Sequence, residues 1–415
     1  MTVNELAPGR SAAYRRALSR RDFRLLWLGS SVSLVGDGMT LVALTWLVLS
    51  QPDGVQRVGL LTVCYTLPVF VGGLLAGPVL DRFDKRHVLA ADSVVRGVAM
   101  AAIPIMSAVG EVPEALPFVV AVVYGLFKMV PLAGFPAAIP DLVPERDRDA
   151  ANALESLSFS LSGMAGPALG GLLIAWLGSE AVLAFDAVSY VVFAVAALAV
   201  RRPLTPRTRT DEPGPAHLPG DGTERPPGGG VLTLLGDRVL VMTTLAFMAF
   251  NIAMGMLMVT APWLAGTRLD GGPRTLGLLL AALSAGELAG AVMAGARSPR
   301  TRPVRAIGVV QLVAAAGFLA ILSVPHTLGV AAGFLVIGMF SAPMTIWAQS
   351  LRMARIPAPL RGRGFAVLRT LMQATPPIGA AAVTPLLAAG TLTPAVLVMA
   401  VVAAAPALAL LAARP

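Results

Sequence analysis

The chain has 415 residues, of which 56% are hydrophobic and only 13% are charged, whereas an ordinary soluble domain carries roughly 25% charged residues. A water-soluble fold has no way to bury so much apolar surface, and the apolar residues form blocks long enough to cross a hydrocarbon layer about 30 Å thick. The net charge of +9 comes from basic residues between these blocks, which excludes a nucleic-acid surface, and the single cysteine, Cys64, excludes disulfides.

The apolar blocks predict α-helices rather than the strands of a barrel. Only helices and closed barrels span a bilayer, because backbone polar groups find no water there. Barrel strands alternate apolar and polar residues, whereas the block from Leu61 to Leu80 is apolar on every face. The sequence therefore predicts an all-α membrane protein.

Twelve membrane spans are predicted from the positions of charged residues and turns. The 46 uncharged residues between Arg305 and Arg352 would form a helix about 69 Å long at about 1.5 Å per residue, so they are divided at a turn over residues 325–327. The stretch from Arg369 to Arg414 is divided in the same way. The predicted spans cover residues 24–50, 58–80, 88–110, 115–139, 154–177, 181–200, 239–264, 275–296, 305–324, 328–350, 364–388 and 394–413.

The distribution of arginine and lysine predicts the orientation of the chain. Alternate connections, counted from the N-terminus, hold 26 of the 32 basic residues, and the other connections hold only three. Because cytoplasmic loops retain positive charge, both termini are predicted to be cytoplasmic in a multi-pass protein of the cell membrane. Residues 201–230 contain seven prolines and six glycines and are predicted to be a disordered cytoplasmic linker. The linker separates a six-helix half, residues 24–200, preceded by a cytoplasmic segment, residues 1–23, from a second half, residues 231–415.

The connection after the second span reads GPVLDRFDKR and resembles the signature loop of the major facilitator superfamily. The shared pattern is Gly77, then Asp81 and Arg82, then a basic pair that ends at Arg86. We expect Gly77 to allow close helix contact, Asp81 to bond a helix N-terminus or an arginine, and the arginines to join neighbouring helix ends. In the family this loop governs the switch between inward- and outward-facing states. Asp84 stands where the common pattern has glycine, and a plain charged loop is the alternative.

The fifth span contains GPALGG, which resembles the antiporter motif of exporting members of this superfamily. Its residues are Gly166, Pro167, Gly170 and Gly171. Proline and glycine let a helix bend and approach its neighbour, so the motif predicts a gating helix, with a purely structural glycine face as the alternative. In the eighth span Gly286, Gly290 and Ala294 recur every four residues and predict a smooth face for a packing partner.

Further segments resemble the branch of bacterial exporters for siderophores and macrolides. They are FRLLWLGSSVSLVGDGMTLVALTWLV in the first span, FDAVSYVV in the sixth and PAPLRGRGFAV before the eleventh. The resemblance covers nearly the whole chain outside the linker. It implies the major facilitator fold, two six-helix halves around a central cavity, and transport by alternating access.

Three ionisable residues are predicted near the middle of the bilayer, where a charge costs at least about 2.5 to 3.5 kcal/mol. Asp37, Lys128 and Glu287 each lie 13 or 14 residues beyond the charged residue that precedes them. A carboxyl group held there can load and release a proton as access alternates. We therefore interpret Asp37 as the proton or cationic-substrate site, with an ion pair to Lys128 as the alternative. Glu287 is a second candidate, and Lys128 is also a candidate for an anionic substrate group.

Other polar residues of the spans receive less specific predictions. Asp92 and Arg96, four residues apart, are expected to pair on one helix face and support the signature loop. Asp186 is expected near the outer surface, in a capping or loop-bonding role. Candidates for lining the cavity are Tyr65, Asn251, Trp347 and Gln349, with packing or lipid contact as the alternative.

The sequence favours proton-coupled efflux of an amphiphilic small organic molecule, such as a drug, antibiotic, siderophore or secondary metabolite. Uptake or uniport by the same fold is one alternative, and a non-transporting membrane receptor is another. An enzyme is not expected, because His87, His217 and His326 all lie in or beside connections, so neither a metal site nor a Ser-His dyad is predicted in the membrane. We expect no cofactor and no nucleic acid. The expected partners are the lipid bilayer, protons and a small-molecule substrate. The protein is expected to be a monomer.

Overall fold

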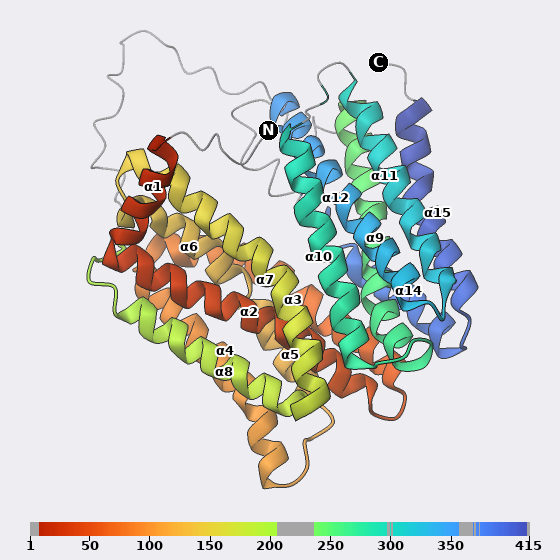
Figure 1. Ribbon diagram of the computed structural model, residues 1–415, viewed down its shortest axis with the longest axis horizontal. Helices are drawn as coiled ribbons and strands as arrows, with labels where there is room; N and C mark the ends of the chain where they lie inside the picture. Colours follow the sequence, from red (N-terminus) through yellow and green to blue (C-terminus); the bar gives the residue numbers. More distant parts are fainter. Residues whose placement is uncertain are drawn as a thin grey trace.

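The computed structural model describes residues 8–205, 236–296, 302–356 and 374–412, together with positions 299, 368, 371 and 372. Within these residues the chain is helical and contains no strand (Figure 1). Eleven of the described helical segments are long and apolar enough to cross a membrane, and Pro376–Ala388 is a shorter apolar helix. The predicted all-α membrane fold is therefore confirmed.

In the first half of the chain, a short N-terminal helix is followed by seven helices that form six spans, which makes eight helices in all. They are α1 (Pro8–Ser19), α2 (Arg21–Leu49), α3 (Gly54–Arg82), α4 (Lys85–Val109), α5 (Leu116–Phe127), α6 (Met129–Leu142), α7 (Arg148–Leu177) and α8 (Ser179–Leu198). A 3-10 turn, Glu145–Asp147, precedes α7. Helices α5 and α6 together make one span that is interrupted at Lys128. Helix α1 falls in the segment predicted to precede the first span.

The second half repeats this arrangement in the residues that the structure describes. Its helices are α9 (Arg238–Thr267), α10 (Pro273–Ala296), α11 (Pro303–Leu319), α12 (Thr327–Arg355), α14 (Pro376–Ala388) and α15 (Leu392–Ala412). A 3-10 segment, Ala320–Ser323, follows α11, and the turn predicted at residues 325–327 separates it from α12. The predicted linker lies outside the described residues from position 206 onward.

Several helices extend beyond the spans predicted from hydropathy. Helix α2 begins at Arg21, α7 begins at Arg148, and α12 ends at Arg355. The added turns carry charged residues. They continue the helix beyond the apolar segment because a helix pairs its backbone groups internally, whether or not its side chains are apolar. Hydropathy therefore predicts the apolar part of each helix and not its full length.

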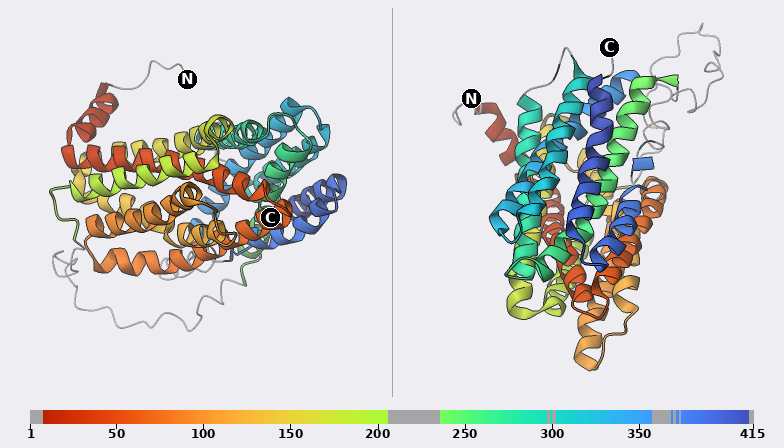
Figure 2. Two further views of the ribbon diagram at one scale, coloured as in Figure 1. Left: turned by 90° about the horizontal axis from the view of Figure 1, so that it is seen from below. Right: turned by 90° about the vertical axis from the view of Figure 1, so that its right-hand side faces the viewer.

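Two bundles of helices lie side by side, α2–α8 in one and α9–α15 in the other (Figures 1 and 2). Helix α1, the beginning of α2 and the end of α15 all lie at one end of the molecule, which we call the termini end. The two bundles diverge toward the termini end (Figure 1). This is the two-half arrangement that the sequence predicts.

The contacts that join the halves lie at the end opposite the termini end. A Cβ on Gly171 of α7 would lie 2.9 Å from the Cα of Gly277 in α10, so these helices touch backbone to backbone. The Trp46 ring, near the end of α2, packs against Gly272 just before α10. Small residues are what allow membrane helices to approach this closely. The halves are therefore closed against each other at this end.

Candidate functional site

A buried cluster of charged and phenolic side chains joins α2, α4 and α8. Arg96 of α4 donates to Asp37 of α2 (Nη1 to Oδ1, 3.2 Å) and to Asp92 of its own helix (Nη2 to Oδ2, 2.6 Å). The Tyr190 hydroxyl of α8 also donates to Asp37, and the Tyr190 ring centre lies 4.4 Å from the Arg96 guanidinium carbon. Arg96 is fully buried, and the Asp37 side chain is 12% exposed. One cation thus faces two carboxylates inside an apolar bundle, where an unpaired charge would be very costly.

Asp186 of α8 is a further buried carboxylate beside this cluster. It accepts hydrogen bonds from the hydroxyls of Thr40 in α2 and Ser189 in α8, and it has no exposed surface. A Cβ on Gly36 of α2 would collide with its carboxylate. The expected capping or loop-bonding role of Asp186 is therefore wrong, because its partners are the Thr40 and Ser189 side chains and it is enclosed between α2 and α8.

Lys128 lies where the fourth span is interrupted. Pro131 has no backbone N–H to donate to the Phe127 carbonyl one turn earlier, which weakens the helix at this point. The Lys128 N–H bonds instead to the Gly125 carbonyl at 3.3 Å, in a tighter turn than an α-helix. Interrupted helices in transporters commonly mark binding sites.

The Lys128 ammonium contacts two tyrosines and no carboxylate within the described part of the chain. It donates to the Tyr65 hydroxyl of α3 and lies 4.8 Å and 5.7 Å from the ring centres of Tyr65 and Tyr124. The two rings stack with centres 5.4 Å apart. The alternative of an ion pair between Asp37 and Lys128 is wrong in this structure, because Asp37 pairs with Arg96.

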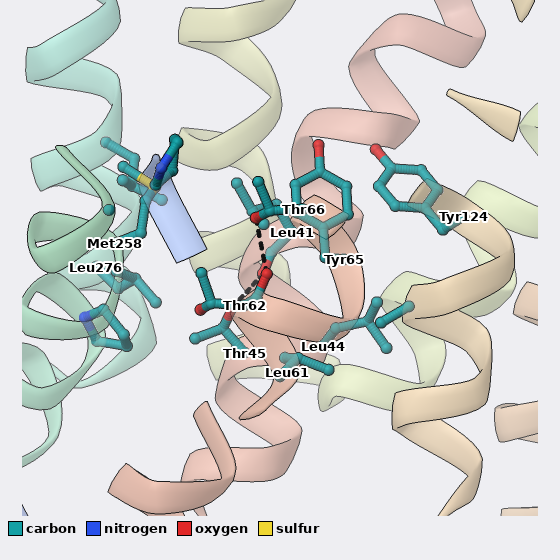
Figure 3. A pocket seen from close by; sticks show the side chains of 15 residues that line it. Leu41, Leu44, Thr45, Leu61, Thr62, Tyr65, Thr66, Tyr124, Met258 and Leu276 are labelled. Carbon is teal, nitrogen blue, oxygen red and sulfur yellow. Dashed lines mark hydrogen bonds between the residues drawn. The ribbon is translucent and has the colours of Figure 1, made fainter. Parts of the chain in front are cut away.

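Both tyrosines line a pocket of about 80 Å³ between the two halves, which we call the central pocket (Figure 3). Its polar lining comes from the first half: Thr45, Thr62, Tyr65, Thr66 and Tyr124. Its lining from the second half is apolar: Met258, Pro262, Leu276 and Leu280. The pocket is therefore polar on one wall and apolar on the other, as an amphiphilic ligand requires.

Glu287 lies apart from this group, on α10 of the second half. It faces a groove of about 330 Å³ whose walls are α7, α10 and α12. Its side chain is exposed, and no hydrogen bond or ion pair to it occurs among the described residues. The structure thus brings Asp37 and Lys128 into neighbouring parts of the first half and leaves Glu287 free on the facing half.

The other cavity candidates occupy different environments. Of the four, only Tyr65 lines the central pocket. The Asn251 amide donates to the Met372 carbonyl at 3.1 Å, and the Trp347 indole N–H points to the Ala294 carbonyl at 3.5 Å. Gln349 is exposed near the termini end of α12.

Asp84 fixes the signature loop between α3 and α4. Its carboxylate caps α4 by accepting from the Arg86 backbone N–H at 2.9 Å, and it accepts from the Arg86 guanidinium at 2.8 Å. Arg86 also donates to the Val200 carbonyl after α8, and the Leu204 N–H donates to Asp84. Partial burial raises the pKa of Asp84, but the hydrogen bonds and the charge of Arg86 outweigh this effect and hold the pKa below its usual value. The residue that departs from the family pattern is the one that holds this loop.

The remaining loop residues do not make the expected contacts. A Cβ on Gly77 would have no atom within 4 Å, so the expected close helix contact at Gly77 is wrong in this structure. Asp81 and Arg82 are exposed, and Arg82 lies 6.0 Å from the Phe83 ring centre. The reason is geometric, because these residues lie at the termini end of α3, away from the contacts that join the halves.

The glycine motif of α7 packs against α2. A Cβ on Gly166 would lie 2.8 Å from the Cα of Gly38, and one on Gly170 would lie 2.9 Å from the Cα of Met39. Pro167 lies inside the helix between these contacts. Together with Gly171, which faces α10, the motif contacts both its own half and the opposite one.

The glycine face of α10 packs within its own half. Gly286 and Gly290 lie against the backbone of Met339 in α12, and the Ala294 carbonyl faces α12 as well. The glycine of α10 that contacts α7 is Gly277, near the other end of the helix.

Sequence reasoning missed Arg352, a buried cation in the second half. Only 2% of its surface is exposed, yet its described partners are the Thr243 carbonyl at 3.3 Å, the Met372 sulfur at 3.8 Å and the Phe247 ring at 5.3 Å. Arg352 lies three residues before Arg355, so it looked like part of a charged span boundary. The roles of Tyr124 and Tyr190 were missed because a tyrosine in an apolar block carries no distinguishing signal.

The site contains groups that are suited to binding ions and polar solutes. Among the described residues no group of three His, Cys, Asp or Glu side chains lies close enough together to hold a metal ion. Buried carboxylates, a shared arginine and a polar pocket between two halves are the features with which transporters bind ions and solutes.

Comparison with known proteins agrees with this geometry. The chain is 29% identical over 368 residues to the multidrug efflux pump Tap of Mycolicibacterium fortuitum, covering 83% of this chain and 84% of that protein. It is 25% identical over 332 residues to the enterobactin exporter EntS of Salmonella choleraesuis, covering 79% and 72%.

Solved structures show the same fold at low sequence identity. Peptide transporter POT in complex with sulfate superposes with a TM-score of 0.76 at 13% identity, covering 96% of this chain and 97% of that one. A bacterial homologue of the lysosomal transporter Spinster, in an inward-facing and unoccupied conformation, gives 0.67 at 16% identity, covering 97% of each chain. The Major Facilitator Superfamily matches residues 26–381. The chain therefore belongs to the Major Facilitator Superfamily of membrane transporters.

Proposed function

We propose that this chain exports an amphiphilic small organic molecule in exchange for protons, by alternating access of the cavity between its two halves. The relatives named as a multidrug efflux pump and as an enterobactin exporter support the direction of transport. The central pocket, with one polar and one apolar wall, supports an amphiphilic substrate.

The observation that carries the proposal is the contact between Asp37 and Arg96. The Asp37 carboxylate holds α2 to α4 and α8 through Arg96 and Tyr190. Protonation removes the negative charge on Asp37, so Asp37 and Arg96 lose their charge–charge attraction. A proton that arrives at Asp37 therefore changes how three helices of the first half are held together, which couples proton binding to helix movement.

The orientation proposed from the sequence makes the termini end cytoplasmic. With the halves closed at the opposite end, this structure then corresponds to a state that takes up substrate from the cytoplasm. Asp81 and Arg82, exposed at the termini end of α3, would engage the other half when that end closes. Residues 201–230 are proposed to link the halves without restraining them.

Transport by purified protein in proteoliposomes tests this proposal. With an imposed pH gradient, the wild-type protein is expected to move a fluorescent amphiphile such as ethidium or dansyl sulfonate against its gradient. Asp37→Asn keeps the shape of the side chain but cannot change charge, so it should lose gradient-driven movement while downhill exchange remains. Asp22→Asn, at the termini end of α2, is the matched control and should behave as wild type.

Each outcome has a definite meaning. Gradient-driven export by Asp37→Asn would remove Asp37 from the coupling step, and Glu287→Gln would then be the next variant to lose it. Accumulation in the uptake direction would favour an importer. If no solute moved under any ion gradient or voltage, the transport proposal itself would be wrong.

A further inference from the structure

Beside the central pocket, in contact with two of the tyrosines that line it, lies one cation that has no counter-ion among the described residues. Lys128 bonds only to the Tyr65 hydroxyl and lies over two aromatic rings. The nearby acids are otherwise engaged, Asp37 with Arg96 and Tyr190, and Asp186 with two hydroxyls. A cation at membrane depth is rarely left in this condition unless an anion reaches it during function.

Four of the five hydroxyl groups that line the pocket, all except that of Tyr65, have already donated their hydrogens. The hydroxyls of Thr45 and Thr66 donate to backbone carbonyls one turn earlier in their own helices, at 2.7 Å (Figure 3). The hydroxyl of Thr62 does the same at 2.8 Å. The Tyr124 hydroxyl donates to the Asp37 carbonyl at 3.2 Å. Among the described residues, the donors that remain here are the O–H of Tyr65, which accepts from Lys128, and the Lys128 ammonium, which has three N–H groups and uses one on Tyr65.

We propose that the central pocket is a binding site for organic anions, in which the negative group of the substrate takes the place of the Tyr65 hydroxyl at Lys128. This inference rests on the proposed export function and specifies its substrate class. The Lys128 ammonium contacts Tyr65 and Tyr124, which both line the pocket, and a charge-assisted bond to it is about twice as strong as a neutral one.

The central pocket and the groove beside α10 also limit the rest of the substrate. The central pocket holds about 80 Å³, enough for a charged head and part of a ring. Leu276 and Leu280 of α10 line this pocket, and Ser284, Glu287 and Leu288 continue the same stripe of α10 into the groove of about 330 Å³. The apolar body of the substrate lies along this stripe of α10. Because the unpaired Glu287 carboxylate faces the groove, the far end of the substrate is neutral or basic.

Two matched probes test the anion site. Dansyl sulfonate and dansyl amide share the same aromatic body, but only the sulfonate carries a negative charge. We expect purified wild-type protein to bind the sulfonate at least about tenfold more tightly, the ratio for one charge-assisted bond. Binding is measured by equilibrium dialysis of the full chain, with dialysis against protein-free detergent as the blank.

Four variants assign the preference to Lys128. Lys128→Met should bind both probes equally, and Lys128→Arg should keep the preference for the sulfonate. Tyr65→Phe removes the hydroxyl to which the Lys128 ammonium donates. The affinity of this variant for the sulfonate should therefore equal or exceed that of the wild type. Arg57→Met also removes one positive charge, but Arg57 pairs with Glu114 at the opposite end, at 2.7 Å, and the variant should match the wild type.

The results separate this inference from the proposed function. Equal binding of the two probes by the wild type, or a sulfonate preference that survives in Lys128→Met, would overturn the anion site. If Lys128→Met fails to fold, a loss of sulfonate preference in Tyr65→Phe overturns it instead, since Tyr65 would then be the ligand. Sulfonate binding without any proton-driven movement in vesicles would refute export and leave the anion site standing.

Discussion

Arg96 of α4 binds Asp37 of α2 across 59 residues of sequence, at 3.2 Å, while it remains bonded to Asp92 one helical turn away. Both carboxylates therefore depend on a single guanidinium that has no exposed surface. The relationship makes Arg96 the residue on which the charge balance of the first half depends.

Removing Arg96 should destabilise the protein severely. Arg96→Gln leaves two carboxylates in the apolar bundle without a cation, and loss of one partner from a buried pair costs about 3 to 5 kcal/mol. Thermal unfolding in detergent measures the effect. Arg57→Gln breaks a partly exposed ion pair and should change the stability by less than about 1 kcal/mol. Arg96→Gln combined with Asp92→Asn should recover part of the loss, and no recovery would show that the two charges are not coupled.

A larger residue at Gly166 should separate α7 from α2. Its Cβ would lie 2.8 Å from the Cα of Gly38, a backbone atom of α2 that cannot move aside as a flexible side chain could. We expect Gly166→Val to lower the unfolding temperature and abolish transport. Gly295→Ala, also in a helix but with nothing within 4 Å of its Cβ, is the control and should be neutral or slightly stabilising. Equal effects of the two substitutions would contradict the close packing.

The loop residue Asp84 should make stability depend on pH. Its pKa is lower in the folded protein than in the unfolded chain, because Arg86 outweighs the effect of burial. The stabilisation is therefore complete above the ordinary pKa of about 4 and is lost as the pH falls through the folded value. Asp84→Asn can still cap α4 but cannot pair with Arg86. The difference in unfolding temperature between wild type and Asp84→Asn should shrink on acidification from pH 7 to pH 3, and a constant difference would refute the ion pair.

A disulfide across the closed end should stop transport reversibly. A Cβ on Gly59 of α3 would lie 3.2 Å from the Cβ of Thr384 in α14, close to the separation of about 3.5 to 4.5 Å in disulfides. Because Cys64 is the only cysteine of the sequence, Cys64→Ala gives a clean background. Gly59→Cys with Thr384→Cys should cross-link on oxidation, block substrate movement, and regain it on reduction. Single-cysteine variants control for the substitutions, and full transport by the cross-linked protein would exclude opening at this end.

The fold could be predicted from the sequence because a bilayer imposes length and hydropathy on every span. Counting from charged boundaries also placed Asp37 and Lys128 within their spans. Their partners were not predictable, because Arg96 and Tyr190 lie 59 and 153 residues from Asp37 and meet it only through the rotation of three helices.

Packing faces show the same limit. The glycines of α10 were correctly recognised as a contact surface, but the sequence does not state which neighbour fills it, and that neighbour is α12. Arg352 was not recognised as a buried group, because a cation near a helix end usually reaches water along its own side chain. Rotation about the helix axis decides both cases, and one sequence contains little information on it.

The backbone contact between Gly171 and Gly277 has a mechanical consequence. It lies near one end of two helices of 30 and 24 residues, so most of each helix extends to one side of it. Because the two helices cross near one end of each, the contact can act as a pivot. A small rotation at the glycines therefore displaces the far ends of the two helices over a much larger distance.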